Sequence, residues 1–192
     1  MRKLISKHKQ EKKQKRNTAI MSGILVLVLC LSVFGIMTSS FGKNQTQKQI
    51  EYNGYNFILQ DNLWYTSIGE LNFAFQYLPN QTNYSNTTLK KLNNYKDKPL
   101  YLYSEDYNSE VEIYRNINQI IERLQPACLN KEECKGDFPI INCEKNSIII
   151  KLSNNTKINQ IENCVYIQGK RENLTQLTDE FLFRIIGIKW KK

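Results

Sequence analysis

Four cysteines in the second half of the chain could support either disulfides or a metal site. They are Cys128, Cys134, Cys143 and Cys164. No two of them have the Cys-x-x-Cys spacing that is typical of structural zinc sites and thiol-redox enzymes. The only histidine, His8, lies near the N-terminus. An even number of cysteines in an exported domain usually forms disulfides, so we predict two bridges and no metal.

The pairing of these cysteines depends on the fold around them, because four cysteines allow three connectivities. If residues 147–168 form a hairpin about Asn154-Asn155, Cys143 comes close to Cys164. Cys128 is then left to pair with Cys134. The sequence favours this arrangement, and a shift of strand register between residues 156 and 161 would change it.

Carboxylates are the other groups that could do chemistry. Acidic residues gather before and within the first turns of two expected helices: Glu105, Asp106, Glu110, Glu112, Asp179 and Glu180. Two carboxyl groups about 5–9 Å apart could hydrolyse a glycosidic bond. Acids in a first helical turn are also favoured by the helix dipole alone, which is the interpretation we prefer. Because the only histidine lies in the N-terminal tail and the sequence has no Gly-rich phosphate loop, we predict no catalytic residue and no cofactor.

Asn-x-Ser/Thr triplets are frequent in the same part of the chain. They begin at Asn44, Asn80, Asn83, Asn86, Asn154 and Asn173. In an exported domain such triplets are candidate glycosylation sites. Asn80, Asn83 and Asn86 fall in an expected polar loop and Asn154 at an expected turn, so these four are the sites we single out.

The cysteines and triplets make sense only if this part of the chain is exported, and the N-terminal residues predict that it is. Residues 19–41 are uncharged and rich in Ile, Leu and Val, enough for a helix of about 34 Å that spans a bilayer. Residues 1–18 hold eight of the 27 basic residues and one of the 18 acidic residues. Such a tail stays on the cytoplasmic side. A cleavable signal peptide is the alternative, but its apolar core is usually shorter.

The same tail explains the formal net charge of +9, because the rest of the chain carries only +2. Basic residues beside a span contact anionic lipid headgroups. We therefore expect the bilayer, and not nucleic acid, as the partner of the tail.

Residues 42–49 predict a polar linker, and residues 50–192 an extracytoplasmic α+β domain. Alternating apolar residues and turn signals such as Asn53-Gly54 predict an antiparallel meander over 49–53, 55–60, 63–68 and 71–78. A short strand at 100–103 and a hairpin of 147–152 with 164–168 should extend the antiparallel structure. Helices at 109–125 and 173–186 have the apolar periodicity to cover the sheet.

Four aromatic residues of the meander, Trp64, Tyr65, Phe73 and Phe75, could line a ligand groove. Aromatic strand residues more often fill a core, and this is the interpretation we favour. Residues 79–98 have few apolar side chains and predict a long surface loop.

The chain resembles single-span membrane proteins of archaeal genomes that have no characterised function. The likeness rests on the basic tail, the span, the Cys-bearing outer domain and four short strings: LWYTSI at 63–68, KPLYLYSED at 98–106, NCVYIQG at 163–169 and TDEFLFRIIGI at 178–188. The resemblance implies an anchored outer domain and no particular activity.

Two functions of different class follow from these patterns. The first is a membrane-anchored extracytoplasmic module that binds a protein or another envelope component. The second is a carboxylate-dependent enzyme that acts on envelope glycans. The sequence has no recognisable catalytic motif, and this favours the binding module.

Overall fold

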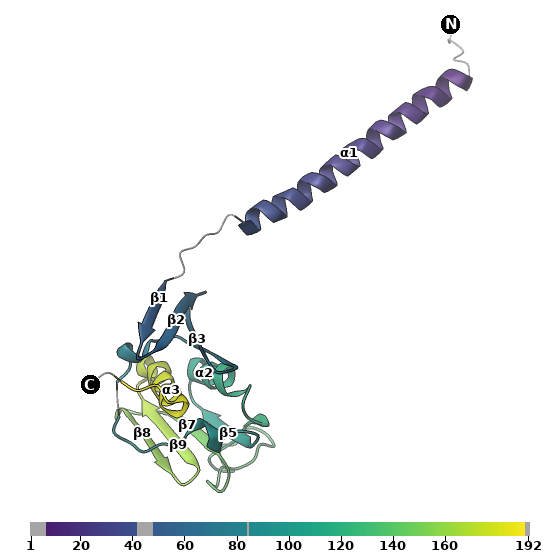
Figure 1. The fold of residues 1–192 in the computed structure, drawn as a ribbon. Helices are drawn as coiled ribbons and strands as arrows, with labels where there is room; N and C mark the ends of the chain where they lie inside the picture. The colour runs from purple at the N-terminus through teal and green to yellow at the C-terminus, as the bar shows by residue number, and fades with distance from the viewer. Residues whose placement is uncertain (1–6, 42–47, 84, 191–192) are drawn as a thin grey trace. The chain divides into compact units, whose positions relative to one another are not determined.

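The computed structural model describes residues 7–41, 48–83 and 85–190 (Figure 1). The chain divides into two compact units, Met1–Thr46 and Gln47–Lys192. Each unit is described by itself below.

The first unit contains one helix, α1 (Lys7–Phe41). An 18-residue window of this helix, Lys15–Ser32, has a mean hydropathy of 1.3 and no buried residue. Among the described residues, α1 is the one helix that is long and apolar enough to cross a membrane. It begins within the basic tail and covers the whole of the predicted span at residues 19–41.

The second unit begins with the predicted four-stranded antiparallel meander. Its strands are β1 (Gln49–Tyr52), β2 (Tyr55–Gln60), β3 (Leu63–Ile68) and β4 (Leu71–Phe75), in that order across the sheet. The first turn has positive φ at both Asn53 and Gly54, and the second has it at both Asp61 and Asn62. Two-residue turns of this kind match the twist of the strands they join, so these short signals fix the register of the hairpins. The expected fourth strand, 71–78, ends three residues early at Phe75.

The remaining strands form a second sheet, which corrects the expectation of antiparallel structure only. They are β5 (Pro99–Ser104), β6 (Arg123–Pro126), β7 (Ser147–Leu152), β8 (Lys157–Ile161) and β9 (Cys164–Gly169). Their order across the sheet is β6-β5-β7-β9-β8. All neighbours run parallel except β8, which is antiparallel to β9.

The predicted hairpin of 147–152 with 164–168 is wrong. Residues 157–161 form β8 and turn back onto β9 through Glu162, whose φ is positive. β7 therefore pairs with β9 in parallel, with Ser147 opposite Cys164. The bridge from Cys143 to Cys164 exists nonetheless, because the two parallel strands start side by side. The second bridge joins Cys128 to Cys134.

The helix predicted at 109–125 is shorter than expected. α2 (Tyr107–Ile117) starts two residues earlier, because the side chain of Asp106 caps it. It ends at Ile117, after which the chain turns and enters β6. β5, α2 and β6 thus form a parallel strand-helix-strand unit, and Pro126 ends β6.

The last helix matches its prediction more closely. α3 (Arg171–Ile186) ends at Gly187, whose φ of 93° is the left-handed conformation that glycine adopts most easily at a helix terminus. Its N-cap is Lys170, which contributes no side-chain hydrogen bond.

One hydrophobic core joins the two sheets, and α2 and α3 contribute to it from between them (Figure 1). Phe183 of α3 illustrates this, because its ring contacts both Phe57 of β2 and Phe75 of β4. α3 also packs on β7 and β9 of the second sheet. The α+β class and the two helices covering a meander are therefore as predicted, and the second, mixed sheet is new.

The polar loop before β5 has more structure than its composition suggested. It contains two short 3-10 turns, Pro79–Gln81 and Leu92–Asn94, and it buries Tyr95. Thr87 donates a hydrogen bond to the main-chain oxygen of Ile158, so the loop lies along the outer edge of β8.

Candidate ligand-binding cleft

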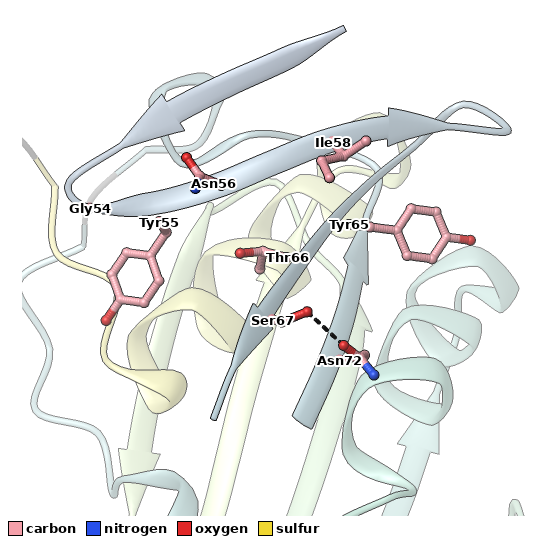
Figure 2. A pocket seen from close by; sticks show the side chains of 8 residues that line it. All are labelled: Gly54, Tyr55, Asn56, Ile58, Tyr65, Thr66, Ser67 and Asn72. Carbon is pink, nitrogen blue, oxygen red and sulfur yellow. Dashed lines mark hydrogen bonds between the residues drawn. The ribbon is translucent and has the colours of Figure 1, made fainter. Parts of the chain in front are cut away.

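The pairing between β2 and β3 stops halfway along the two strands. The recorded register joins Gln60 to Leu63, Leu59 to Trp64 and Ile58 to Tyr65, and goes no further. Beyond this point β2 continues beside β1 only, and β3 beside β4 only. Figure 2 shows the two strands diverging, so that a wedge opens between them.

Main-chain polar groups face this wedge from both sides. The N–H of Leu59 donates to the main-chain oxygen of Lys48, on the β1 side of β2. The main-chain N–H and C=O groups of successive residues point to opposite sides of a strand, so those of Asn56 point toward β3. Tyr65 pairs with Ile58 of β2, so Ser67, two residues further along β3, also directs its main-chain N–H and C=O toward β2. Asn56 and Ser67 would form the next hydrogen-bonded pair if the ladder continued, and they do not pair with each other.

The wedge widens into a cleft of about 360 Å³. Its lining is Gly54, Tyr55, Asn56, Ile58, Tyr65, Thr66, Ser67 and Asn72. This volume lies within the range of small-molecule and short-peptide sites, about 300–1,000 Å³. No residue of this lining carries a charge, and hydroxyl and amide groups predominate.

Thr66 is the unusual member of this lining. It is only 4% exposed, and within the described part of the chain its hydroxyl Oγ1 has no hydrogen-bond partner. An unsatisfied buried hydroxyl costs about 1–3 kcal/mol of stability, so such groups are uncommon in folded proteins. Figure 2 shows the Thr66 hydroxyl pointing away from β3, toward the space beneath β2.

The other side chains give the cleft a fixed wall and two aromatic ends. Ser67 Oγ donates to Asn72 Oδ1 over 2.6 Å, which ties β3 to β4 beside the cleft. The rings of Tyr55 and Tyr65 lie at opposite ends and point away from each other (Figure 2). Tyr65 is 37% exposed.

The β4 wall is held in place by α2. Asn116 of that helix and Gln119, which follows the helix, each exchange two hydrogen bonds with the main chain of β4, at Ala74 and Asn72 respectively. The outer edge of β4 is therefore satisfied by side chains, whereas β2 and β3 do not pair with each other in the wedge.

The predicted carboxylates lie elsewhere and serve the fold. Asp106 caps α2 by accepting hydrogen bonds from the N–H and hydroxyl of Ser109, and Arg171 lies 3.5 Å from it. Glu105 accepts from the main-chain N–H of Leu152. Glu110 is half-buried. None of these acids belongs to the lining of the cleft.

Glu112 and Asp179 are the two predicted acids that the structure brings together. Both are fully buried where α2 meets α3. Asp179 Oδ2 accepts the N–H groups of Gln76 and Tyr77, which is why β4 ends before them. Burial, and then the nearby charge of Glu112, raise the pKa of Asp179 well above its ordinary value.

Burial also raises the pKa of two further acids of these helices, Glu112 and Glu180. For Glu112, Arg115, 2.7 Å away, opposes this shift in pKa. For Glu180, the hydrogen bonds that it accepts from Ser85 oppose the shift in pKa. A cluster so enclosed links helices and strands and offers no surface to a substrate.

Of the four aromatic residues considered for a groove, only Tyr65 lines the cleft. Trp64, Phe73 and Phe75 are buried in the core, as the favoured interpretation expected. Sequence reasoning missed Thr66, although one signal was present: a hydroxyl residue between Trp64 and Ile68 on the inward face of a strand. The groups on Asn56 and Ser67 gave no signal, because their availability depends on where the ladder stops.

The remaining predicted sites do not meet the cleft. Asn80, Asn83, Asn86 and Asn154 are exposed. Asn44 lies outside the described residues. The described residues contain no group of three or more His, Cys, Asp or Glu side chains that could hold a metal ion.

Comparisons of the chain with protein-family models, curated proteins and solved structures found no match.

Proposed function

We propose that this protein is a membrane-anchored, extracytoplasmic binding module, and that the cleft between β2 and β3 is its ligand site. The N-terminal tail lies in the cytoplasm, α1 crosses the membrane once, and the globular unit lies outside.

The topology is supported by charge and by sulfur chemistry. Eight basic residues precede the apolar segment of α1 and are retained on the cytoplasmic side. The two disulfides, Cys128–Cys134 and Cys143–Cys164, lie in the globular unit, and disulfides persist in oxidising compartments.

The observation that carries the binding proposal is the unsatisfied hydroxyl of Thr66 in the lining of the cleft. A buried polar group without a partner lowers stability, and such costs recur where a ligand supplies the missing hydrogen bond. Asn56 and Ser67, which the β2–β3 ladder does not join, add two further polar positions at the same place.

The carboxylate chemistry of the alternative function has less support. Glycoside hydrolysis needs two carboxyl groups about 5–9 Å apart on either side of a substrate. Glu112 and Asp179 are fully buried and hold main-chain and Arg115 groups. We therefore propose binding and not catalysis.

Photo-crosslinking in native membranes tests this proposal. A photoreactive phenylalanine analogue replaces Tyr65 in the cleft, or Tyr114 on α2 as the matched control; both tyrosines are exposed, 37% and 56%. We expect a defined adduct from position 65 and none from position 114. Equal labelling at both positions, or none at 65, contradicts the assignment of the cleft.

Protease treatment of intact cells tests the topology separately. A tag after Lys192 should be removed when protease is added outside, while the basic tail, residues 1–18, stays protected. A C-terminal tag that survives until the cells are lysed contradicts the proposed orientation.

A further inference from the structure

We infer that the cleft binds the end of an extended, uncharged polypeptide segment, which inserts between β2 and β3 and hydrogen-bonds to both. This inference rests on the proposed function and names the ligand class of the same site.

Main-chain groups on both walls of the cleft support the choice of a polypeptide as the ligand. Asn56 on one wall and Ser67 on the other each direct an N–H and a C=O into the wedge, at positions where a neighbouring strand would bond. An extended polypeptide presents N–H and C=O groups along both of its edges, so one inserted segment can satisfy both walls. Strand addition of this kind obtains its affinity from main-chain hydrogen bonds.

The shape of the wedge limits the length of the segment. It is closed at Ile58 and Tyr65, where the β2–β3 ladder begins, and it opens toward Tyr55 and Ile68. The three residues of each strand beyond the ladder correspond to about 10 Å of extended chain. A chain end or the tip of a loop, about three residues long, therefore fits better than a strand that passes through.

The chemistry of the lining sets the character of the segment. The absence of charge from the lining disfavours phosphate, metal ions and charged side chains, since burial of a charge without a partner is costly. Thr66, which would lie opposite Phe57 if the ladder continued, directs its unsatisfied hydroxyl toward the inserted segment. We expect a hydroxyl, an amide or a main-chain group of the ligand to meet it.

The experiment uses the full chain, labelled with ¹⁵N in detergent micelles, and defined probes. The first probe is an acetylated hexapeptide of alternating threonine and valine. The second is the same peptide with alternate nitrogens methylated, which removes the donors along one edge. The third carries lysine in place of threonine, and the fourth is a neutral chitin oligosaccharide.

We expect the first probe to shift the amide signals of Asn56 and Ser67 saturably and to slow their hydrogen exchange. The methylated and lysine peptides should bind at least tenfold more weakly. The inference is overturned if methylation has no effect, or if the oligosaccharide shifts these signals and the peptide does not.

Two variants at Ser67 separate the main chain from the side chain. Ser67→Pro removes the N–H that faces β2, at a position whose N–H the β3–β4 ladder does not use. Ser67→Ala keeps that N–H. We expect at least tenfold weaker binding of the first probe by Ser67→Pro and less than twofold by Ser67→Ala. Equal binding by both folded variants overturns the inference.

Thr66→Val gives a second measurement should Ser67→Pro fold poorly. It retains the shape of the side chain and should weaken binding of the first probe about fivefold. An unchanged affinity for this probe contradicts the role of the hydroxyl. Crosslinking at position 65 in membranes without binding of the first probe overturns the ligand class and leaves the proposed function standing. Probe binding without any crosslinked partner at position 65 overturns the proposed function and leaves the ligand class standing.

Discussion

The side chain of Asn116 pairs with the main chain of Ala74 as a neighbouring strand would. Its Oδ1 accepts the Ala74 N–H over 2.8 Å, and its Nδ2 donates to the Ala74 oxygen over 2.9 Å. Asn116 is fully buried, so water cannot replace these bonds. α2 thereby closes the edge of β4 and fixes the wall of the cleft. An exposed strand edge would otherwise invite pairing with another chain.

Asn116→Ala should lower the free energy of unfolding of the globular unit by about 3 kcal/mol. The substitution leaves the N–H and C=O of Ala74 buried and unpaired, at about 1–3 kcal/mol for each group. Gln119→Ala is the matched control, because Gln119 makes the same kind of contact with Asn72 but is exposed. Its cost should stay near 1 kcal/mol or below, since water can take its place. Urea denaturation followed by tryptophan fluorescence measures both, and equal losses would show that burial is not the reason.

Thr66→Val should raise the stability of the same unit by about 1 kcal/mol. Removing a buried hydroxyl that has no partner ends its desolvation cost while the volume is retained. Thr88→Val, at an exposed position, should change stability by less than about 0.5 kcal/mol. Thermal unfolding without ligand provides the measurement. A loss of stability in Thr66→Val would mean that the hydroxyl has a partner when no ligand is bound.

The stability of the unit should fall as the pH rises above 4, in part because of Asp179. Its pKa is raised from an ordinary value of 3.8 by burial and by Glu112, so the folded state holds a proton that the unfolded state releases. That contribution is complete below the ordinary value and is lost as the pH rises through the pKa of the folded state. The raised pKa of Glu112 acts in the same direction.

Asp179→Asn should reduce this pH dependence. Asparagine stays uncharged, accepts the N–H groups of Gln76 and Tyr77 with its oxygen, and removes the repulsion with Glu112. Urea midpoints between pH 4 and pH 8 test the effect, with Asp137→Asn at an exposed position as the control. A slope that is the same in Asp179→Asn and in the unmodified protein would exclude Asp179 as its source.

The two disulfides should differ in what they contribute. Cys143–Cys164 closes a sequence separation of 21 residues and Cys128–Cys134 one of 6. By loop-closure entropy, their removal as pairs of alanines should cost about 3 and about 2 kcal/mol respectively. Denaturation of the two double variants under non-reducing conditions measures the difference. A larger loss at the short loop would place its contribution in native contacts instead of chain entropy.

Prediction from sequence succeeded where the signal and the structure it controls lie close together in the chain. Asn53-Gly54 and Asp61-Asn62 each adopt positive φ at both turn positions, and Gly187 ends α3. These outcomes depend on the conformational preferences of two or three residues. It failed for the end of α2, because β5 recruits residues 123–126 as a parallel strand over a separation of about 24 residues in the chain.

The amino-acid sequence by itself determined the apolar helix near the N-terminus and the meander. Only the tertiary structure decided that β7 and β9 are parallel, that Glu112 and Asp179 meet, and that the β2–β3 ladder stops at Ile58 and Tyr65. The physical reason is that turn conformation and hydrophobic patterning are local, whereas a buried group acquires or lacks a partner only when distant segments pack. Thr66 reads as an ordinary strand residue in the sequence, and the fold around it leaves its hydroxyl without a hydrogen bond.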